Sequence, residues 1–262
     1  MLAAERKERI IEMLDANKTV KVTDLSKIFS TTEATIRRDL DELARDNMLR
    51  RIHGGAIALP SASKSFYISE IVEQCSEEKK MIADFALHYI KDDDAIILDS
   101  STTCMELAIR IAESNYSNLS IITNSFGLLK FFENHKNISV IHTGGNVFYD
   151  LNCATGLFAE QMIKNVRVDK CFIGTNGIDS KYGYSVPTLN DASLKKAILF
   201  ASHQCYVLAD HTKFGESYMG KFAEPNDQVH YLITDYVPKT FNINTISKST
   251  KIKVIGEPAE ML

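Results

Sequence analysis

The sequence has little of what marks a membrane, secreted or metal-binding protein. It contains no tryptophan, and its longest apolar stretches, such as residues 95–98, are only as long as a strand, which excludes a transmembrane helix. Charged residues at the N-terminus stand where a signal peptide needs an apolar run. The five cysteines lie far apart without a Cys-x-x-Cys pair, which argues against a zinc site or a disulfide framework. We therefore expect a cytoplasmic protein with reduced thiols, no metal and no cofactor.

The sequence also lacks an overall basic charge, since its formal net charge is −4. The first 60 residues carry 11 basic and 10 acidic side chains, whereas the remainder carries 19 basic and 24 acidic ones. The acidity therefore belongs to the C-terminal part. If the N-terminal part binds nucleic acid, the basic surface that does so must be local.

The first sixty residues have the pattern of a helix-turn-helix. Apolar side chains at helical spacing predict a helix over residues 3–16, a short second helix that begins near Thr23, and a third over residues 32–46. A tight polar turn separates the second helix from the third. This order and these lengths are typical of DNA-binding domains whose third helix enters the major groove.

The third predicted helix has one apolar stripe and one polar face. Ile36, Leu40 and Leu43 recur at helical spacing and are expected to be buried. The residues that we expect to meet DNA are Thr32, Ala34, Thr35, Arg37 and Arg38. Small side chains permit close approach to a groove, and arginine donates two hydrogen bonds to guanine or binds phosphate. The alternative is that both arginines only solvate a surface helix and pair with Asp41 or Glu42.

A predicted hairpin follows the third helix. Residues 49–59 give two short strands around Gly54 and Gly55, which is the pattern of a wing. Its basic residues Arg50, Arg51 and His53 are expected beside the phosphate backbone. Two basic clusters on consecutive elements of a near-neutral domain indicate a local DNA-binding surface.

These two segments carry a family resemblance. Thr35-Ile36-Arg37-Arg38-Asp39-Leu40, followed by Leu49-Arg50-Arg51-Ile52-His53-Gly54-Gly55-Ala56, resembles the signature of the DeoR family of bacterial repressors, and the resemblance extends to about Asp235. It implies operator DNA as a partner and a C-terminal domain that senses a phosphorylated sugar or a related metabolite. We expect binding as a homodimer or homotetramer, with paired recognition helices in successive major grooves. A repressor of a carbohydrate-utilisation operon is the expected function.

The chain divides into two predicted domains. Residues 1–59 are expected to form the winged helix-turn-helix and residues 60–75 a linker that is small, polar and contains proline. Residues 76–262 alternate between apolar strands and helices, which predicts an α/β domain with a parallel sheet covered on both faces. By the family resemblance, this fold is similar to those of ribose-5-phosphate isomerases and CoA transferases.

Polar residues and glycines gather where the predicted strands end, which is where open α/β sheets bind ligands. The candidate ligand-binding residues at these ends are Asp99, Ser100, Ser101, Thr102, Thr103, Thr123, Asn124, Gly144, Gly145, Gly174 and Asn176. The hydroxyls and free N–H groups at 99–103 suit an anion, although a plain helix cap is the alternative. Lys195 and Lys213 are added because the family resemblance implies cations there; taken alone, either is an ordinary surface charge.

Two departures from the family pattern bear on the ligand. Ser101 stands where the phosphate loop usually has glycine, and Asp191 stands where glutamate is usual. The rival interpretation is a sugar-phosphate isomerase-like enzyme that carries a DNA-binding domain. The Asp-Gly-Ala-Asp-Glu run typical of those isomerases is absent, so we expect no catalysis. A DNA-bending protein without a ligand is a third alternative, but it leaves the polar strand ends without a purpose.

Overall fold

A computed structural model describes residues 3–17, 19–45, 48–52, 54–58, 74–225, 228–246 and 248–256. The contacts within the chain divide it into two compact units, residues 1–61 and 62–262. Each unit has a hydrophobic core of its own, so each is treated as a separate domain. Within the described residues, no helix combines the length and the apolar character needed to span a bilayer.

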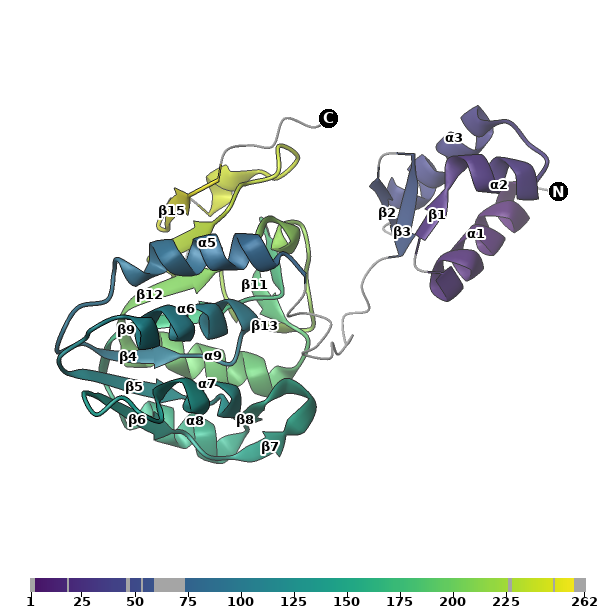
Figure 1. The fold of residues 1–262 in the computed structure, drawn as a ribbon. Coiled ribbons are helices and arrows are strands. Elements are labelled where there is room, and N and C mark those ends of the chain that lie inside the picture. The colour runs from purple at the N-terminus through teal and green to yellow at the C-terminus, as the bar shows by residue number, and fades with distance from the viewer. Residues whose placement is uncertain are drawn as a thin grey trace. The chain divides into compact units, whose positions relative to one another are not determined.

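In the described part of the N-terminal domain, three helices pack with a three-stranded antiparallel sheet (Figure 1). Its elements are α1 (Ala3–Asn17), β1 (Thr19–Lys21), α2 (Val22–Ile28), α3 (Glu33–Arg45), β2 (Leu49–Ile52) and β3 (Gly55–Ala58). The predicted wing is confirmed as the β2–β3 hairpin. The strand β1 was not predicted; it pairs with β3 and closes the sheet in the order β1-β3-β2.

The C-terminal domain is built on a seven-stranded parallel sheet, as predicted. Its strands lie in the order β15-β14-β12-β9-β4-β5-β6. Their bounds are β4 (Ala95–Leu98), β5 (Leu119–Thr123), β6 (Ile138–His142), β9 (Val168–Gly174), β12 (Ser202–Leu208), β14 (Tyr231–Thr234) and β15 (Lys251–Val254). Because every neighbouring pair is parallel, the carboxyl ends of all seven strands meet at one edge.

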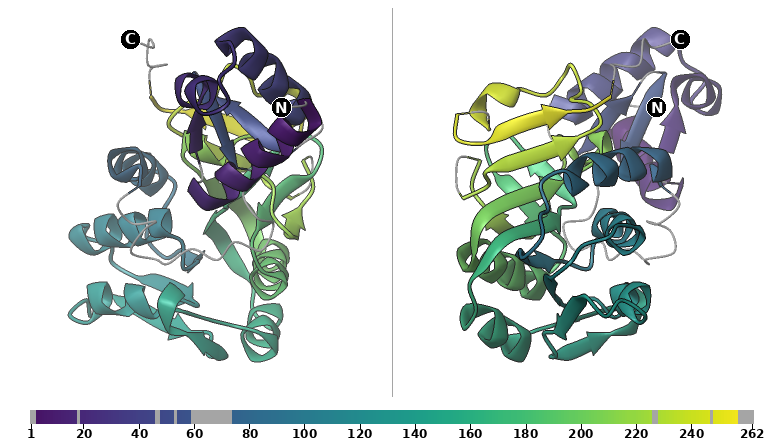
Figure 2. Two further views of the ribbon diagram at one scale, coloured as in Figure 1. Left: turned by 90° about the vertical axis from the view of Figure 1, so that its right-hand side faces the viewer. Right: turned by 60° about the vertical axis from the view of Figure 1, so that its left-hand side comes forward.

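Helices cover both faces of this sheet (Figure 2). On one face lie α5 (Ser76–Leu87), α6 (Thr102–Glu113) and α7 (Phe126–Phe132), packed on inward side chains such as Ile96 and Leu98. On the other lie α8 (Leu157–Lys164) and α9 (Leu189–Ala201), packed on the alternate side chains such as Ile97. Successive strand residues therefore serve opposite cores, which explains why these strands read as continuous apolar runs.

Among the described residues, the domain also contains two small antiparallel sheets and three short 3-10 helices. The hairpin of β7 (Asn146–Phe148) and β8 (Cys153–Thr155) follows β6, with η1 (Tyr149–Leu151) between its strands. A three-stranded sheet joins β10 (Gly177–Asp179), β11 (Gly183–Val186) and β13 (Gly220–Ala223). The remaining elements are η2 (His211–Lys213) and η3 (Ile243–Thr245). The two small sheets follow the carboxyl ends of β6 and β9, so they flank the edge where the candidate ligand site was predicted.

Candidate functional site

The predicted recognition helix α3 has the amphipathic character that the sequence indicates. Ile36 and Leu40 are completely buried and Leu43 nearly so. Arg37 and Arg38 lie on the opposite side, with 60% and 82% of their side chains exposed. Ala34 between them and the helix start is also exposed. The N-terminal half of α3 therefore presents a small residue and two long cations to solvent, which is the chemistry that a major-groove helix needs.

Both arginines are paired within the helix. Arg37 Nη2 lies 2.9 Å from Glu33 Oε2, and Arg38 Nε lies 3.3 Å from Glu42 Oε1, each at an i, i+4 spacing. The surface pairing that we considered as the alternative is thus present for Arg38, while Arg37 uses Glu33. Exposed pairs of this kind contribute only about 0.3–0.5 kcal/mol. Such weak pairs leave both guanidinium groups free to exchange a carboxylate for a base or a phosphate.

The start of α3 is fixed by two threonines. Thr32 Oγ1 accepts a hydrogen bond from the Thr35 N–H at 3.2 Å, which is the contact of an N-cap residue. The two hydroxyl groups are also hydrogen bonded to each other at 2.9 Å. Thr32 and Thr35 therefore hold the first turn, the part of a recognition helix that approaches DNA.

The wing is braced against α3 by Arg51. Its Nε lies 2.8 Å from Asp41 Oδ1, and its Nη1 donates to the Gly55 carbonyl at 2.6 Å. A Cβ at Gly55 would overlap the Val20 carbonyl of β1, so glycine is required where these two strands meet. Arg51 thus connects helix and hairpin. His53 and the side chain of Arg50 lie outside the described residues.

One ion pair of the N-terminal domain was missed by the sequence reasoning. Asp39 is buried and accepts two hydrogen bonds from Arg6, at 2.5 Å from Nε and 3.1 Å from Nη2. This bidentate pair ties α1 to α3. The helical spacing alone gave no signal for it, because Asp39 stands beside the apolar stripe and Arg6 on another helix.

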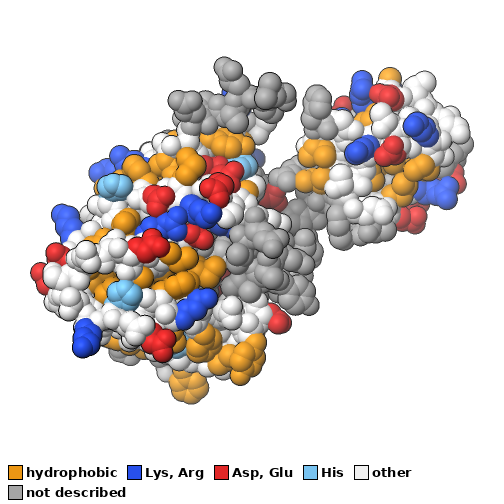
Figure 3. Space-filling view, in the orientation of Figure 1, with side chains coloured by type: hydrophobic (Ala, Val, Ile, Leu, Met, Phe, Trp, Pro, Cys, Tyr) orange, Lys and Arg blue, Asp and Glu red, His pale blue; other side chains and the backbone are white. Residues whose placement is uncertain are grey.

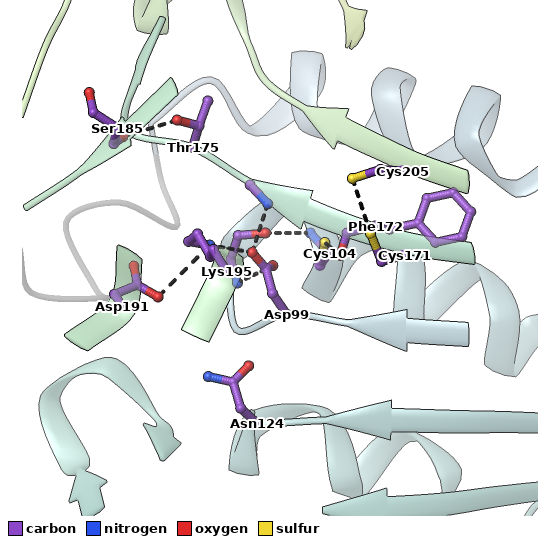
Figure 4. Close-up of polar contacts among 12 residues, drawn as sticks. Asp99, Cys104, Asn124, Cys171, Phe172, Thr175, Ser185, Asp191, Lys195 and Cys205 are labelled. Carbon is purple, nitrogen blue, oxygen red and sulfur yellow. Dashed lines mark hydrogen bonds and ion pairs between the residues drawn. The ribbon is translucent and has the colours of Figure 1, made fainter. Parts of the chain in front are cut away.

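At the carboxyl edge of the large sheet, Asp99 is the centre of a buried network (Figure 4). Its Oδ1 accepts from the Ser101 N–H at 2.9 Å, and its Oδ2 accepts from the Gly174 N–H at 2.8 Å and from Lys195 Nζ at 2.5 Å. The network joins the ends of β4 and β9 to α9. Asp99 therefore has a structural role, because its hydrogen bonds fix the loop that leads into α6.

Lys195 is buried between two carboxylates, with only 5% of its side chain exposed. Its Nζ lies 4.0 Å from Asp191 Oδ1 as well as against Asp99, and Figure 4 shows it between the two. Burial by itself lowers the pKa of Lys195, but the charges of Asp191 and Asp99 outweigh it and raise that pKa above its usual range. Burial likewise opposes the charge of Asp99, and Lys195 overcomes it, so the pKa of Asp99 is lowered.

Ser101 occupies its position without strain. Its φ of −68° and ψ of 151° are ordinary for any residue, and its Oγ accepts from the Cys104 N–H as the N-cap of α6. The helix cap that we considered as an alternative is therefore present. The nearby glycine that is needed is Gly174, because a Cβ there would lie 2.7 Å from Ser101 Oγ and closer still to its Cβ.

The next strand end carries buried polar atoms that no described residue satisfies. Asn124 is buried, and its Nδ2 donates to the Ala154 carbonyl at 3.0 Å, but its Oδ1 has no hydrogen-bond partner among the described residues. Thr155 Oγ1, one residue beyond Ala154, is also buried and without a described partner. In Figure 4 the Asn124 amide lies on the side of β5 that faces Asp99 and Lys195.

The remaining candidates at the strand ends are placed by backbone contacts. Thr123 accepts through its carbonyl from the Thr143 N–H at 2.9 Å, which brings the ends of β5 and β6 together. Gly144 and Gly145, with φ of 68° and 119°, turn the chain into β7. The Asn176 N–H donates to the Ser185 carbonyl at 3.1 Å, and Thr102 and Thr103 are buried in the first turn of α6.

Cys153 is a second residue that the sequence reasoning missed. It is buried at the start of β8, close enough to Ser100 for its thiol to interact with that side chain. Burial raises the pKa of Cys153 to about 11, and the charge of Asp191 adds to the increase. The hairpin that carries Cys153 was not predicted, so nothing in the sequence pattern indicated that this residue would reach the strand ends.

Lys213 belongs to another group at the same edge. Its Nζ lies 3.6 Å from Asp210 Oδ2 and 3.0 Å from Thr212 Oγ1. Lys79 of α5, also missed by the sequence reasoning, is buried near Asp210, and the charge of Lys213 acts on it. Burial lowers the pKa of Lys79, and Asp210 works in the opposite direction. Two lysines thus face one buried aspartate here.

Comparison with known proteins gives matches over both domains. Residues 6–62 match the DeoR-like helix-turn-helix domain, and residues 74–236 match the DeoR C terminal sensor domain. The chain is 36% identical to the uncharacterized HTH-type transcriptional regulator YulB of Bacillus subtilis, over 98% of both chains. It is 33% identical to the HTH-type transcriptional regulator GolR of Listeria innocua, over 82% of this chain and 84% of that one.

A named repressor and a solved structure are also similar. The HTH-type transcriptional repressor GlcR of Bacillus subtilis is 30% identical over 91% of this chain and 90% of its own. Ribose 5-phosphate isomerase A of Methanocaldococcus jannaschii superposes with a TM-score of 0.39 and 15% identity, over 53% of this chain and 54% of that chain.

Proposed function

Because the chain belongs to the DeoR family of transcriptional regulators, and is therefore a DNA-binding regulator rather than an enzyme, we propose that it represses a carbohydrate-utilisation operon and is released from its operator by a phosphorylated sugar. The relative GlcR, which carries the name of a repressor, supports the sign of regulation. We also propose that the protein is cytoplasmic, because the operator DNA that it binds lies in the cytoplasm.

The DNA-binding half of the proposal rests on the exposed N-terminal half of α3. Its arginines are held only by weak i, i+4 pairs, and Thr32 and Thr35 fix the turn that carries them. Arg38 is the most exposed of these side chains and lies opposite the buried stripe. It is the residue that we assign to base contact, with Arg37 as its neighbour.

Arg38→Ala should weaken binding to the specific operator by about 2 kcal/mol, roughly 30-fold, because a bidentate contact to guanine contributes about 1–3 kcal/mol. Fluorescence anisotropy on operator and on random DNA measures both losses. Arg45→Ala, at the other end of α3, is the matched control and should change little. An equal loss on random DNA would show that Arg38 contacts only phosphate.

The effector half of the proposal is carried by the buried Asn124 Oδ1. An acceptor without a partner costs about 1–3 kcal/mol when it is buried. Thr155 Oγ1, at the end of β8, is also buried and has no hydrogen-bond partner among the described residues. A ligand hydroxyl that donates to Asn124 Oδ1 removes this cost, and sugars present several such hydroxyls. We therefore place the sugar moiety at the ends of β5 and β8.

The phosphate is assigned to the neighbouring helix start. The first N–H groups of a helix have no intrahelical acceptor and carry the positive end of its dipole, so Thr102 and Thr103 of α6 offer an anion site. Lys213 supplies a cation at the same sheet edge. Lys195 is already neutralised by Asp99 and is assigned to positioning of the loop rather than to direct contact.

Phosphorylated sugars should raise the melting temperature of the full chain, whereas their unphosphorylated counterparts should not. A ligand at about 100 times its Kd stabilises by about 2.7 kcal/mol, which corresponds to about 5 °C or more. Lys213→Ala should reduce this shift, and Lys221→Ala, which removes an exposed lysine paired with Glu224, should retain it. The effector assignment fails if no phosphorylated sugar shifts the melting temperature, or if Lys213→Ala responds like the unaltered protein.

We also propose that the C-terminal domain self-associates, because paired recognition helices read two half-sites. A set of large apolar side chains is exposed around the β7–β8 hairpin and the starts of α8 and α9, namely Val147, Phe148, Tyr149, Leu157, Phe158 and Leu189. Figure 3 shows apolar side chains along the edge where Figure 1 places β7, β8 and α8. Exposed apolar groups of this size favour a protein partner. A second copy of this chain is the occupant that we propose.

A further inference from the structure

A group of metal-ligating side chains lies at the carboxyl ends of β12 and β14, where α5 begins. Cys75, Asp210 and His211 each bring one ligand atom within 4.8 Å of the others. His211 also belongs to an overlapping set with Glu78 and Asp235 under the same distance limit. These residues come from three distant parts of the sequence, which is why the cysteine spacing gave no sign of them.

His211 is oriented as the ligating histidines of metal sites are. Its Nδ1 is hydrogen bonded to Asp235 Oδ2 at 2.5 Å, and its ring stacks on Tyr236 with centroids 4.3 Å apart. A carboxylate on one ring nitrogen fixes the tautomer and presents the other nitrogen to a metal. With Asp235 in that role, Nε2 is the ring nitrogen that is left to bind a metal.

The donor set selects the metal. A thiolate, an imidazole and a carboxylate together suit Zn²⁺, whereas Mg²⁺ and Ca²⁺ prefer oxygen ligands alone. Tetrahedral zinc bonds place ligand atoms about 3.5 Å apart, so donors that lie within 4.8 Å of one another need to approach by at most about 1.3 Å. Three protein ligands leave the fourth position to water or to an anion, as in open zinc sites.

The charges around the group are compatible with a dication. Asp210, Asp235 and Glu78 are acidic, and the positive charges of Lys79 and Lys213 interact with Asp210. With a zinc dication and a thiolate at Cys75 added to these three carboxylates and two lysines, the net charge of the group would be zero. Lys213, only 3.6 Å from Asp210 Oδ2, is the cation that competes with the metal for that carboxylate.

From this arrangement we propose that Cys75, Asp210 and His211 form a zinc site, with Asp235 holding the imidazole. Its ligands are neither the Asp99 network nor the residues at the ends of β5 and β8. Lys213, which we assign to the effector's phosphate, lies 3.6 Å from Asp210 Oδ2 and is therefore where the two sites adjoin. It also departs from the sequence-based expectation that the protein binds no metal.

Titration of the tag-free, metal-stripped full chain with Zn²⁺ should show one ion bound per chain. Cys75→Ser and His211→Gln should each weaken binding by about 100-fold or more, and Asp235→Asn by about 10–100-fold, because it acts through the histidine. Lys213→Ala should strengthen binding, since it removes a like charge beside the metal. His203→Ala, at an exposed histidine outside the group, should leave the affinity unchanged.

The absorption spectrum of bound Co²⁺ tests whether Cys75 is itself a ligand, because a purely structural role of Cys75 would not affect a thiolate-to-metal band. Co²⁺ bound to the unaltered protein should show a thiolate-to-metal charge-transfer band, which Cys75→Ser removes and Cys153→Ser retains. Circular dichroism of each variant without metal verifies its fold. The assignment is overturned if the band is absent, if it survives Cys75→Ser, or if folded Cys75→Ser and His211→Gln bind zinc as tightly as the unaltered chain.

Discussion

Lys195→Met should destabilise the C-terminal domain by about 3–5 kcal/mol, the cost of leaving one member of a buried ion pair without its partner. Asp99 has 2% of its side chain exposed and would lose its cationic partner, while the Ser101 and Gly174 N–H groups would remain as donors. Urea unfolding followed by circular dichroism measures the loss. Lys196→Met, one residue away on the exposed side of α9, should change stability by less than about 0.5 kcal/mol.

The pH dependence separates a lost charge pair from lost packing. In the unaltered protein the pKa of Asp99 is lowered, so its contribution to stability is present above the unfolded pKa of about 3.9 and is lost as the pH falls through the lower folded value. In Lys195→Met, burial raises the pKa of Asp99 instead. The cost of burying the unpaired carboxylate then disappears as the carboxyl group is protonated at lower pH. The difference in the free energy of unfolding between Lys195→Met and the unaltered protein should therefore become smaller from pH 7 to pH 4. A difference that stays constant with pH would indicate a packing defect alone.

The elements that could be predicted from the sequence are those with a strong local pattern. The parallel strands are continuous apolar runs because both faces of the sheet are covered, and α3 has a clear stripe because only one of its sides is buried. The sheet of β10, β11 and β13 could not be predicted in this way. Its strands are three or four residues long, and the register of β11 with β13 is set by pairing across a long stretch of chain.

The candidate site was predictable as a place but not as a set of contacts. Parallel strands bring their carboxyl ends to one edge, so polar residues after successive strands were expected together. The burial of Lys195 was not expected, because α9 is covered on most sides and no stripe distinguishes its buried lysine from the exposed Lys196. Cys153 and Thr155 were missed because the hairpin that brings them to this edge has no clear alternation.

Gly174→Ala should destabilise the C-terminal domain by about 3 kcal/mol, because the added methyl group has no room beside Ser101. The position lies at the end of β9, where the Gly174 N–H donates to Asp99. Any shift that relieves the overlap therefore lengthens this hydrogen bond or moves the Ser101 cap of α6. The same variant should lose part of its response to the effector, since the loop from 99 to 103 is what the network holds in place.

The overlap lies with a side chain, which makes the prediction reversible. In Ser101→Gly the Cβ and Oγ are gone, and the nearest remaining Ser101 atom to a Cβ at 174 is the Cα at 3.9 Å, an ordinary contact. The double variant Ser101→Gly/Gly174→Ala should then be more stable than Gly174→Ala, even though Ser101→Gly alone costs a few tenths of a kcal/mol at the N-cap. A double-mutant cycle measures this coupling directly. Additive losses would show that Gly174 is required by its backbone rather than by Ser101. If the double variant instead loses less stability than the two single variants together, the two positions are coupled. Ser101 is then accommodated because residue 174 has no side chain.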